Sequence, residues 1–147
     1  MKVGIAGYGV VGRRRGSFVE KHPDLELVAL CDRDFDHEGV NKKGIRQFRD
    51  YRSLLTEDLD VLLVCLTNDI APEVTIAGLE HGLHVFCEKP PGRNVGDIGR
   101  VKACEALHPS QKLMYGFNHR YHHSVTDALE IVRSRELGAV VNLRGVY

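Results

Sequence analysis

The sequence predicts an α/β protein built on a doubly wound parallel sheet, the Rossmann arrangement. Short apolar runs alternate along the chain with amphipathic segments of helical length, which is the pattern of successive βαβ units. Within most runs the apolar residues are consecutive rather than alternating, as expected for parallel strands that helices cover on both faces. A glycine-rich turn between the first run and the first helical segment is a third sign of this fold class.

Each apolar run is predicted to be one strand of the sheet. In chain order these strands are Lys2–Ala6, Leu25–Cys31, Ile45–Phe48, Val61–Leu66, His84–Cys87 and Lys112–Gly116. The run over Ile45–Phe48 is the weakest of them, and residues 37–43 before it fit neither a helix nor a strand.

Helices are predicted between the strands, over Val11–Lys21, Tyr51–Leu55, Pro72–His81 and Val95–Leu107. Pro72 suits the first turn of its helix, and Gly82 suits the left-handed residue that follows its end. Asn94 is placed to cap the next helix, with Asp97 three residues further on. Residues 89–93, which include two prolines and a glycine, are predicted to form a fixed turn.

The chain changes character after Gly116. A polar and aromatic stretch leads to a predicted helix over Ser124–Leu137, capped by Ser124, and then to an alternating strand over Ala139–Tyr147. We therefore expect a Rossmann domain over residues 1–120. Residues 121–147 are expected to be only the first helix and strand of a second, α+β domain.

This last predicted strand cannot form a sheet alone. It is expected to pair with the edge of the main sheet, with another chain, or with a domain outside this sequence. An unpaired strand exposes backbone donors and acceptors beside apolar side chains, which favours pairing with a second copy. We therefore expect homo-oligomerisation through residues after about Tyr121.

Composition excludes several classes of partner. Hydrophobic residues make up 43% and charged residues 27% of the 147 residues, the balance of a soluble globular protein. The formal net charge is zero, so neither a nucleic acid nor an acidic membrane surface is an expected partner. The longest apolar run has the length of a strand, well short of the roughly 18 residues of a membrane span.

The four cysteines and the clustered histidines give no sign of a metal or redox site. The cysteines contain no CxxC pair, and three of them lie within or at the end of strand-like runs, where cysteine acts as a small buried hydrophobe. We expect a reduced, cytoplasmic protein. His119, His122 and His123 are joined by no carboxylate or cysteine in a recognisable pattern, so no metal site is expected.

The strongest local motif is Gly7-Tyr8-Gly9-Val10-Val11-Gly12, a GxGxxG turn between a strand and a helix. In that context the motif indicates dinucleotide binding. Gly7 permits the tight turn, Gly9 lets the backbone approach a pyrophosphate, and Gly12 allows the helix to pack closely on the strand. The helix N-terminus offers free N–H groups to the phosphates. The alternative is a glycine-rich turn in a flavodoxin-like sheet that binds nothing.

The end of the second strand predicts which cofactor binds. Asp32 lies 20 residues after Gly12, where a carboxylate accepts hydrogen bonds from the adenosine ribose hydroxyls. It also repels a 2′-phosphate, which favours NAD over NADP. Arg33 beside it is able to stack on adenine or to pair with a 2′-phosphate, so NADP stays possible.

Three arginines, Arg13, Arg14 and Arg15, follow the glycine turn. Cations in the first turn of a helix oppose its dipole, and a bound pyrophosphate would reverse the sign of that effect. For each single arginine, we expect the side chain to face solvent as an ordinary helix former.

The fifth predicted strand is followed by Glu88 and Lys89. Since ligands of open α/β sheets bind beyond the carboxyl ends of the strands, both side chains are expected at the cofactor crevice. A lysine there is able to hold a substrate hydroxyl or carbonyl and to stabilise negative charge that develops on its oxygen. The alternative is a surface Glu–Lys pair with little energetic effect.

Several separated motifs agree with one known family. They are Thr67-Asn68, Glu73, His84-Val85-Phe86-Cys87-Glu88-Lys89-Pro90 and Gly116-Phe117-Asn118-His119-Arg120-Tyr121. In this order, between the glycine turn and Glu136-Leu137-Gly138, they resemble the Gfo/Idh/MocA oxidoreductase family, which includes glucose–fructose oxidoreductase and inositol dehydrogenase.

The resemblance implies NAD(P)-dependent hydride transfer at a carbinol carbon of a sugar, cyclitol or nucleotide sugar. It implies that Lys89 is the catalytic, substrate-binding lysine and that Asn118 and Arg120 approach the nicotinamide and the substrate. The remaining cofactor contacts that it implies come from Leu66, Thr67, Asn68, Glu88 and Lys89.

Two departures from the family pattern matter. Ala71 stands where the family often carries a histidine, so any role of that histidine is absent. Family members also continue well beyond this length, into an antiparallel sheet that binds substrate. The sequence therefore leaves two functions open: the cofactor half of a working oxidoreductase, or a module that binds a dinucleotide without turnover.

Overall fold

The computed structural model describes residues 1–145 and divides the chain into two compact units. The first unit is Met1–Gly116, and the second is Phe117–Tyr147. The two units are described separately below.

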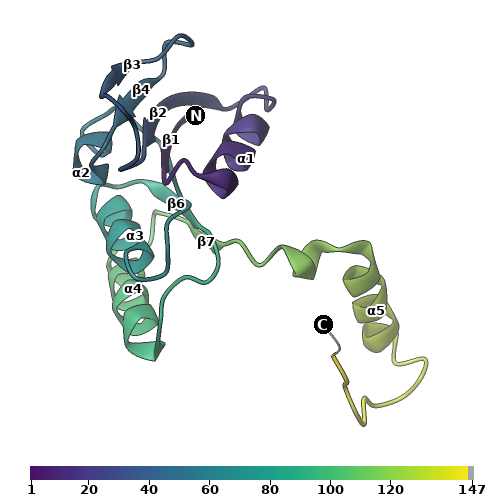
Figure 1. Ribbon diagram of the computed structural model, residues 1–147. Helices are drawn as coiled ribbons and strands as arrows, with labels where there is room; N and C mark the ends of the chain where they lie inside the picture. Colours follow the sequence, from purple (N-terminus) through teal and green to yellow (C-terminus); the bar gives the residue numbers. More distant parts are fainter. Residues whose placement is uncertain (146–147) are drawn as a thin grey trace. The chain divides into compact units, whose positions relative to one another are not determined.

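The first unit is built on one seven-stranded sheet (Figure 1). Its strands are β1 (Lys2–Ala6), β2 (Glu26–Cys31), β3 (Gly39–Val40), β4 (Arg46–Phe48), β5 (Val61–Val64), β6 (His84–Cys87) and β7 (Leu113–Tyr115). Their order in space is β3-β4-β2-β1-β5-β6-β7, and every pair is parallel except β3 with β4. The chain winds outward from β1 in both directions, which confirms the predicted doubly wound sheet.

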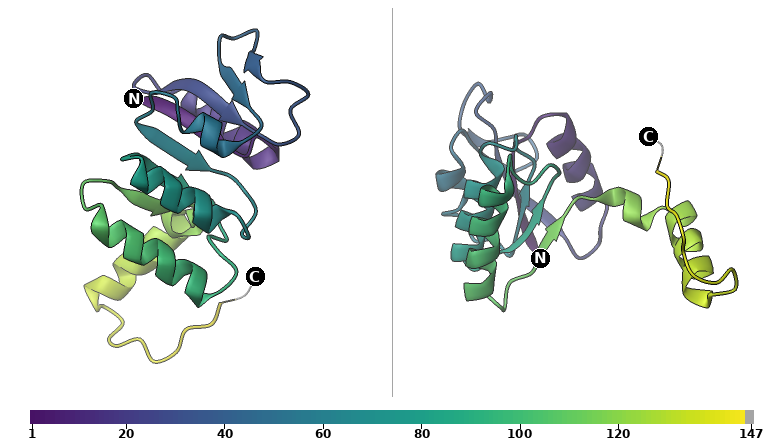
Figure 2. Two further views of the ribbon diagram at one scale, coloured as in Figure 1. Left: turned by 90° about the vertical axis from the view of Figure 1, so that its left-hand side faces the viewer. Right: turned by 90° about the horizontal axis from the view of Figure 1, so that it is seen from below.

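Helices cover both faces of this sheet. They are α1 (Val10–Val19), α2 (Tyr51–Leu54), α3 (Ala71–Glu80) and α4 (Val95–Leu107). Helix α1 lies on one face, and α3 and α4 lie side by side on the other (Figures 1 and 2). Two buried clusters follow this division. Val19 of α1 packs with Val3 and Ile5 of β1, while Leu79 of α3 and Cys104 of α4 belong to the opposite cluster.

Two of the predicted helix-end residues, Asn94 and Gly82, take the expected roles. The Asn94 side chain accepts a 3.0 Å hydrogen bond from the backbone N–H of Asp97, which confirms the cap of α4. Gly82 follows α3 with φ at +77°, the left-handed conformation that favours glycine. The observed elements differ from the predicted ones by one or two residues at several ends, and residues 37–43 contain the short antiparallel strand β3.

The second unit contains a 3-10 helix, η1 (Asn118–Tyr121), and the helix α5 (His123–Ser134). The predicted helix over Ser124–Leu137 is therefore shorter at its C-terminal end. It stops at Ser134 because Arg135 takes a left-handed conformation, with φ at +58°. The predicted cap at Ser124 is wrong, since His122 is the N-cap residue and provides no side-chain hydrogen bond.

The predicted strand over Ala139–Tyr147 is wrong for residues 139–145, which form no regular secondary structure; residues 146 and 147 lie outside the described part. Alternating apolar and polar residues become a strand only when a neighbouring strand supplies hydrogen-bond partners. Instead, Val141 is 96% and Leu143 is 91% exposed. Self-association through residues after Tyr121 stays a prediction, now without the strand on which it relied.

Among residues 1–145 we find no helix that combines the length and the apolar character needed to cross a membrane.

Candidate functional site

The carboxyl ends of five parallel strands meet at one edge of the sheet in the first unit. There the residue after each strand donates its backbone N–H to a residue of the neighbouring strand: Gly7 to Cys31 (2.8 Å), Cys65 to Ala6 (2.7 Å), Glu88 to Val64 (2.8 Å), Gly116 to Cys87 (2.9 Å) and Asp32 to Phe48 (3.0 Å). The sheet ladder thus continues one residue beyond the strands. It places the predicted glycine turn, acid and lysine turn on a single edge.

The three glycines of the turn differ in what surrounds them. A Cβ atom on Gly7 would lie 2.5 Å from the carbonyl oxygen of Cys65, and one on Gly12 would lie 1.9 Å from that of Gly7. Gly7 also has φ at +90°, so the fold requires both glycines. A Cβ on Gly9 would meet nothing within 4 Å. The protein itself therefore does not require glycine at position 9, and the open space is the kind that a close-lying ligand fills.

Asp32 reaches back to the glycine turn. Its carboxylate accepts a 2.6 Å hydrogen bond from the backbone N–H of Tyr8 and a 3.0 Å hydrogen bond from that of Asp34. These two contacts fix the carboxylate beside the N-terminus of α1, while Val10 and Val11 of that helix stay exposed. Each oxygen keeps a second lone pair, so hydrogen bonds from a ribose are compatible with this arrangement.

Arg33 stands beside Asp32 with its side chain 91% exposed. Its guanidinium lies 3.8 Å from the carboxylate of Asp34, and its carbonyl oxygen accepts a hydrogen bond from Nε of Arg49. An exposed ion pair of this kind is weak. The neighbouring acid nevertheless offsets part of the positive charge that a 2′-phosphate would need.

The turn after β5 carries Leu66, Thr67 and Asn68. The Thr67 carbonyl accepts the backbone N–H groups of Ile70 (3.2 Å) and Ala71 (3.0 Å), and this closes the turn into α3. A hydrogen bond from the Thr67 side chain lowers the pKa of Asp69. Leu66 and Asn68 are half-buried and Thr67 is exposed, all at the same sheet edge as the glycine turn.

Glu88 is buried and pairs with a residue that sequence reasoning placed in solvent. Its Oε1 accepts a 2.6 Å hydrogen bond from Nε of Arg15, and Nη2 of Arg15 forms an ion pair with the same oxygen. The alternative of a weak surface Glu–Lys pair is therefore wrong, and so is a solvent-facing role for Arg15. The missed signal was spacing: Arg15 follows the sheet-packed Gly12 by three positions, so both lie on one helix face.

Lys89 is exposed just beyond β6, and its peptide bond to Pro90 is cis. The turn that follows is held by Asp97, whose carboxylate accepts the backbone N–H of Arg93 at 3.0 Å and is paired with Arg100 at 2.9 Å. These hydrogen bonds, that of the Arg93 backbone above all, lower the pKa of Asp97. The predicted fixed turn thus has a definite anchor at the start of α4.

Asn118 and Arg120 lie in η1 of the second unit, and both are exposed. The Arg120 guanidinium lies 5.7 Å from the centre of the Tyr121 ring. Their predicted contact with nicotinamide and substrate stays a prediction.

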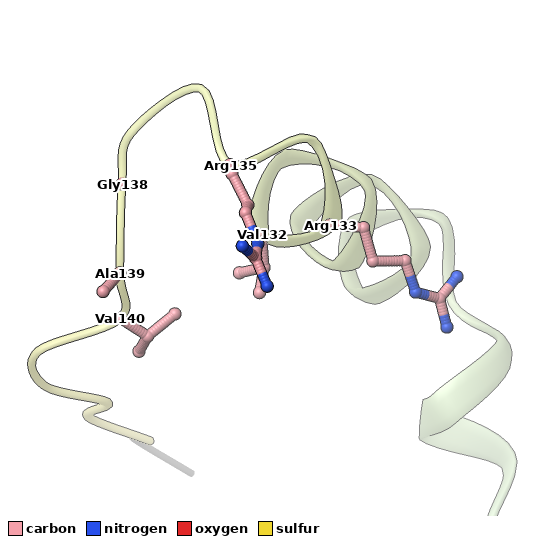
Figure 3. Close-up of a pocket in the computed structure, with 6 residues that line it drawn as sticks. All are labelled: Val132, Arg133, Arg135, Gly138, Ala139 and Val140. Atoms are coloured by element: carbon pink, nitrogen blue, oxygen red, sulfur yellow. The ribbon is translucent and has the colours of Figure 1, made fainter.

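A pocket in the second unit does not have the composition of an active site. It lies between the end of α5 and the segment after it, where Arg135 and Val140 point toward the enclosed space and Arg133 points away (Figure 3). Its lining residues are Val132, Arg133, Arg135, Gly138, Ala139 and Val140. This set contains no acid, nucleophile or general base.

The sheet order, the open position at Gly9 and the acid at the end of β2 define a Rossmann domain of the dinucleotide-binding class. Residues 1–117 match the Gfo/Idh/MocA family, described as an oxidoreductase family with an NAD-binding Rossmann fold. The chain belongs to this family, as the separated motifs predicted.

Similar proteins include inositol dehydrogenases. Inositol 2-dehydrogenase of Salmonella paratyphi B is 29% identical over 99% of this chain and 45% of its own length. The crystal structure of myo-inositol 2-dehydrogenase from Lactobacillus plantarum matches 94% of this chain and 42% of its own, with a TM-score of 0.83 and 30% identity. Scyllo-inositol dehydrogenase from Lactobacillus casei, solved with NAD(H) and scyllo-inositol, shares the fold at 23% identity, a TM-score of 0.82, and coverage of 94% and 42%. The chain thus spans less than half the length of these relatives.

Proposed function

We propose that this chain is the cofactor-binding part of an NAD(P)-dependent oxidoreductase that prefers NAD. The reaction is hydride transfer between the nicotinamide and a carbinol carbon of a sugar, cyclitol or nucleotide sugar. Family membership supports the cofactor and the reaction class, and the inositol dehydrogenases among its relatives support a polyhydroxylated substrate.

The observation that carries the proposal is the environment of Gly9. The residues around it fit a dinucleotide because the turn leaves open space at this one glycine, at the N-terminus of a ten-residue helix. Backbone N–H groups there bind the pyrophosphate. Asp32, fixed by Tyr8 and Asp34, accepts hydrogen bonds from the adenosine ribose, and Leu66, Thr67 and Asn68 line the same edge.

Lys89 has the chemical role in this proposal. The bound nicotinamide supplies the hydride acceptor. The Lys89 ammonium donates a hydrogen bond to the reacting oxygen of the substrate and orients the carbinol carbon toward the nicotinamide. It also stabilises the negative charge that develops on that oxygen as the hydroxyl proton is released to water. Its exposure beyond β6 leaves the side chain accessible to a substrate. Asn118 and Arg120 are proposed to contact the substrate as well.

The second candidate is a module that binds a dinucleotide without turnover. It requires only the glycine turn and Asp32, which lie together within Met1–Gly116. The two functions share every cofactor contact and differ only in whether a substrate is converted.

One pair of measurements tests both candidates. Calorimetric titration of the 147-residue chain with NADH and NADPH tests cofactor binding. Turnover with NAD+ and a panel of inositols, glycosides and nucleotide sugars then separates an enzyme from a binding module. Absence of binding to either dinucleotide contradicts both.

Cofactor preference is expected to depend on Asp32. Replacing it with asparagine removes the negative charge that repels a 2′-phosphate and keeps Arg33. The ratio of NADPH to NADH affinity should then rise about tenfold, a change of about 1.4 kcal/mol. Asp34→Asn is the matched control, because this side chain is exposed and its loss should change the ratio less. A wild-type chain that already binds NADPH more tightly than NADH would show that Arg33 dominates.

A further inference from the structure

One ion pair joins the helix of the glycine turn to the strand that precedes Lys89. Arg15 of α1 donates from Nε to Oε1 of Glu88 at 2.6 Å and forms an ion pair with the same oxygen through Nη2. The Arg15 guanidinium also lies 4.9 Å from the centre of the Phe86 ring in β6. The side chains of Arg15 and Glu88 are only 24% and 9% exposed, so water screens this pair much less than it screens a surface pair.

Glu88 contacts two further parts of the site. Its other carboxylate oxygen, Oε2, lies 3.3 Å from the backbone N–H of Lys89, which donates to it. The same oxygen also lies against Gly116, where a Cβ would come within 2.8 Å of Oε2. Glu88 is therefore held between the arginine, the lysine backbone and a glycine that leaves it room.

We propose that Arg15 is a positioning residue. It acts through Glu88 to hold the Lys89 turn in a fixed position relative to the phosphate-binding helix. This inference rests on the proposed function, because it assigns the pair to the nicotinamide half of the cofactor site. Arg15 lies one turn into the helix whose N-terminus binds the pyrophosphate, and Glu88 immediately precedes the catalytic lysine.

Charge and shape explain why this position uses arginine. Burying a carboxylate without a neighbouring cation costs free energy, so Glu88 stays buried only while a cation is paired with it. Arginine offers several N–H donors in a fixed plane and stacks on an aromatic ring, whereas lysine offers a compact ammonium without either property. Both the hydrogen bonds to Glu88 and the approach to Phe86 use that plane.

The pair should affect the two halves of the dinucleotide differently. ADP contains the adenosine and the pyrophosphate, which bind at Asp32 and the glycine turn, but it lacks the nicotinamide ribose. Loss of the ion pair should therefore lower the affinity for NADH and leave the affinity for ADP unchanged. If Arg15 had a purely structural role, its loss would lower both affinities together.

The first test is Arg15→Gln in the 147-residue chain, with NADH and ADP affinities measured by calorimetry. We expect about a tenfold loss of NADH affinity, the size of one charge-assisted hydrogen bond, and less than about a twofold change for ADP. Arg14→Gln is the matched control, because it removes the same charge from an exposed neighbour on the same helix. Arg15→Lys should lose part of the NADH affinity, and the pair Arg15→Gln with Glu88→Gln should lose less than the sum of the single variants.

Gly116→Ala keeps the inference testable if Arg15→Gln does not fold. The new methyl group displaces the Glu88 carboxylate without removing a charge. The affinity for NADH should therefore fall again, while the affinity for ADP should not change. The inference is overturned if Arg15→Gln binds NADH as tightly as wild type. It is also overturned if the affinities for NADH and ADP fall equally in either variant. If the wild-type chain binds neither ligand, the proposed function itself is wrong, and the two failures are thus distinguishable.

Discussion

Replacing Gly9 with valine should weaken NADH binding strongly without changing the stability of the fold. The backbone at Gly9 has φ at −70° and ψ at −155°, which a valine is able to adopt, and a Cβ there meets no protein atom within 4 Å. The branched side chain would instead occupy the space that the pyrophosphate needs. We expect about a 100-fold loss of affinity, equivalent to about 2.7 kcal/mol, by calorimetry with NADH.

Gly12→Ala provides the opposite control. Its Cβ would lie 1.9 Å from the carbonyl oxygen of Gly7, a contact with backbone that cannot rotate away. This variant should lose about 3 kcal/mol of stability or fail to fold. An unchanged NADH affinity in a folded Gly9→Val chain would show that the dinucleotide does not pass over the glycine turn.

Replacing Lys89 with alanine should reduce turnover by about 100-fold or more and leave the melting temperature nearly unchanged. The side chain is exposed, so its loss removes little packing. In the proposed role, the variant also loses the hydrogen bond that would stabilise the charge developing on the reacting oxygen. The measurement is steady-state turnover with NAD+ and an inositol, in this chain or in a fusion to the remaining part of an inositol 2-dehydrogenase.

Lys112→Ala is the matched control for this lysine. Lys112 is also exposed, but it precedes β7 and therefore lies at the opposite edge of the sheet. Its replacement should leave turnover unchanged. Equal activity in the Lys89→Ala and Lys112→Ala variants would reduce Lys89 to an ordinary surface residue.

The sequence predicted the sheet and its helices because both signals are local and strong. Consecutive apolar residues such as Val61–Val64 are buried or half-buried between helices, and caps such as Asn94 act within a few residues. The glycine turn was predictable for the same reason, since position and spacing fix its geometry. Short β3 was missed because its two residues, Gly39 and Val40, are exposed and too few to form an apolar run.

The errors concern interactions between residues far apart in the sequence. Arg15 and Glu88 are 73 residues apart. The spacing from Gly12 places Arg15 on the sheet-facing side of its helix, but it does not identify Glu88 as the partner. The strand expected over Ala139–Tyr147 did not form in residues 139–145 because an alternating pattern only favours a strand, and the strand itself forms only where a partner strand supplies hydrogen bonds. Local pattern therefore predicted the elements and the edge where they meet, but not the contacts made across that edge.

The hydrogen bonds that continue the sheet beyond β1, β2, β5, β6 and β7 have a thermodynamic consequence for binding. Ordering a free residue costs about 1–2 kcal/mol in backbone entropy. Here the residues that start the glycine turn, the acidic turn and the lysine turn are already tied to neighbouring strands by backbone hydrogen bonds of 2.7 to 3.0 Å. Folding of the domain therefore already includes the loss of backbone entropy at these residues. A ligand binds at this edge to a preorganised surface, so less of the binding free energy is offset by ordering the protein.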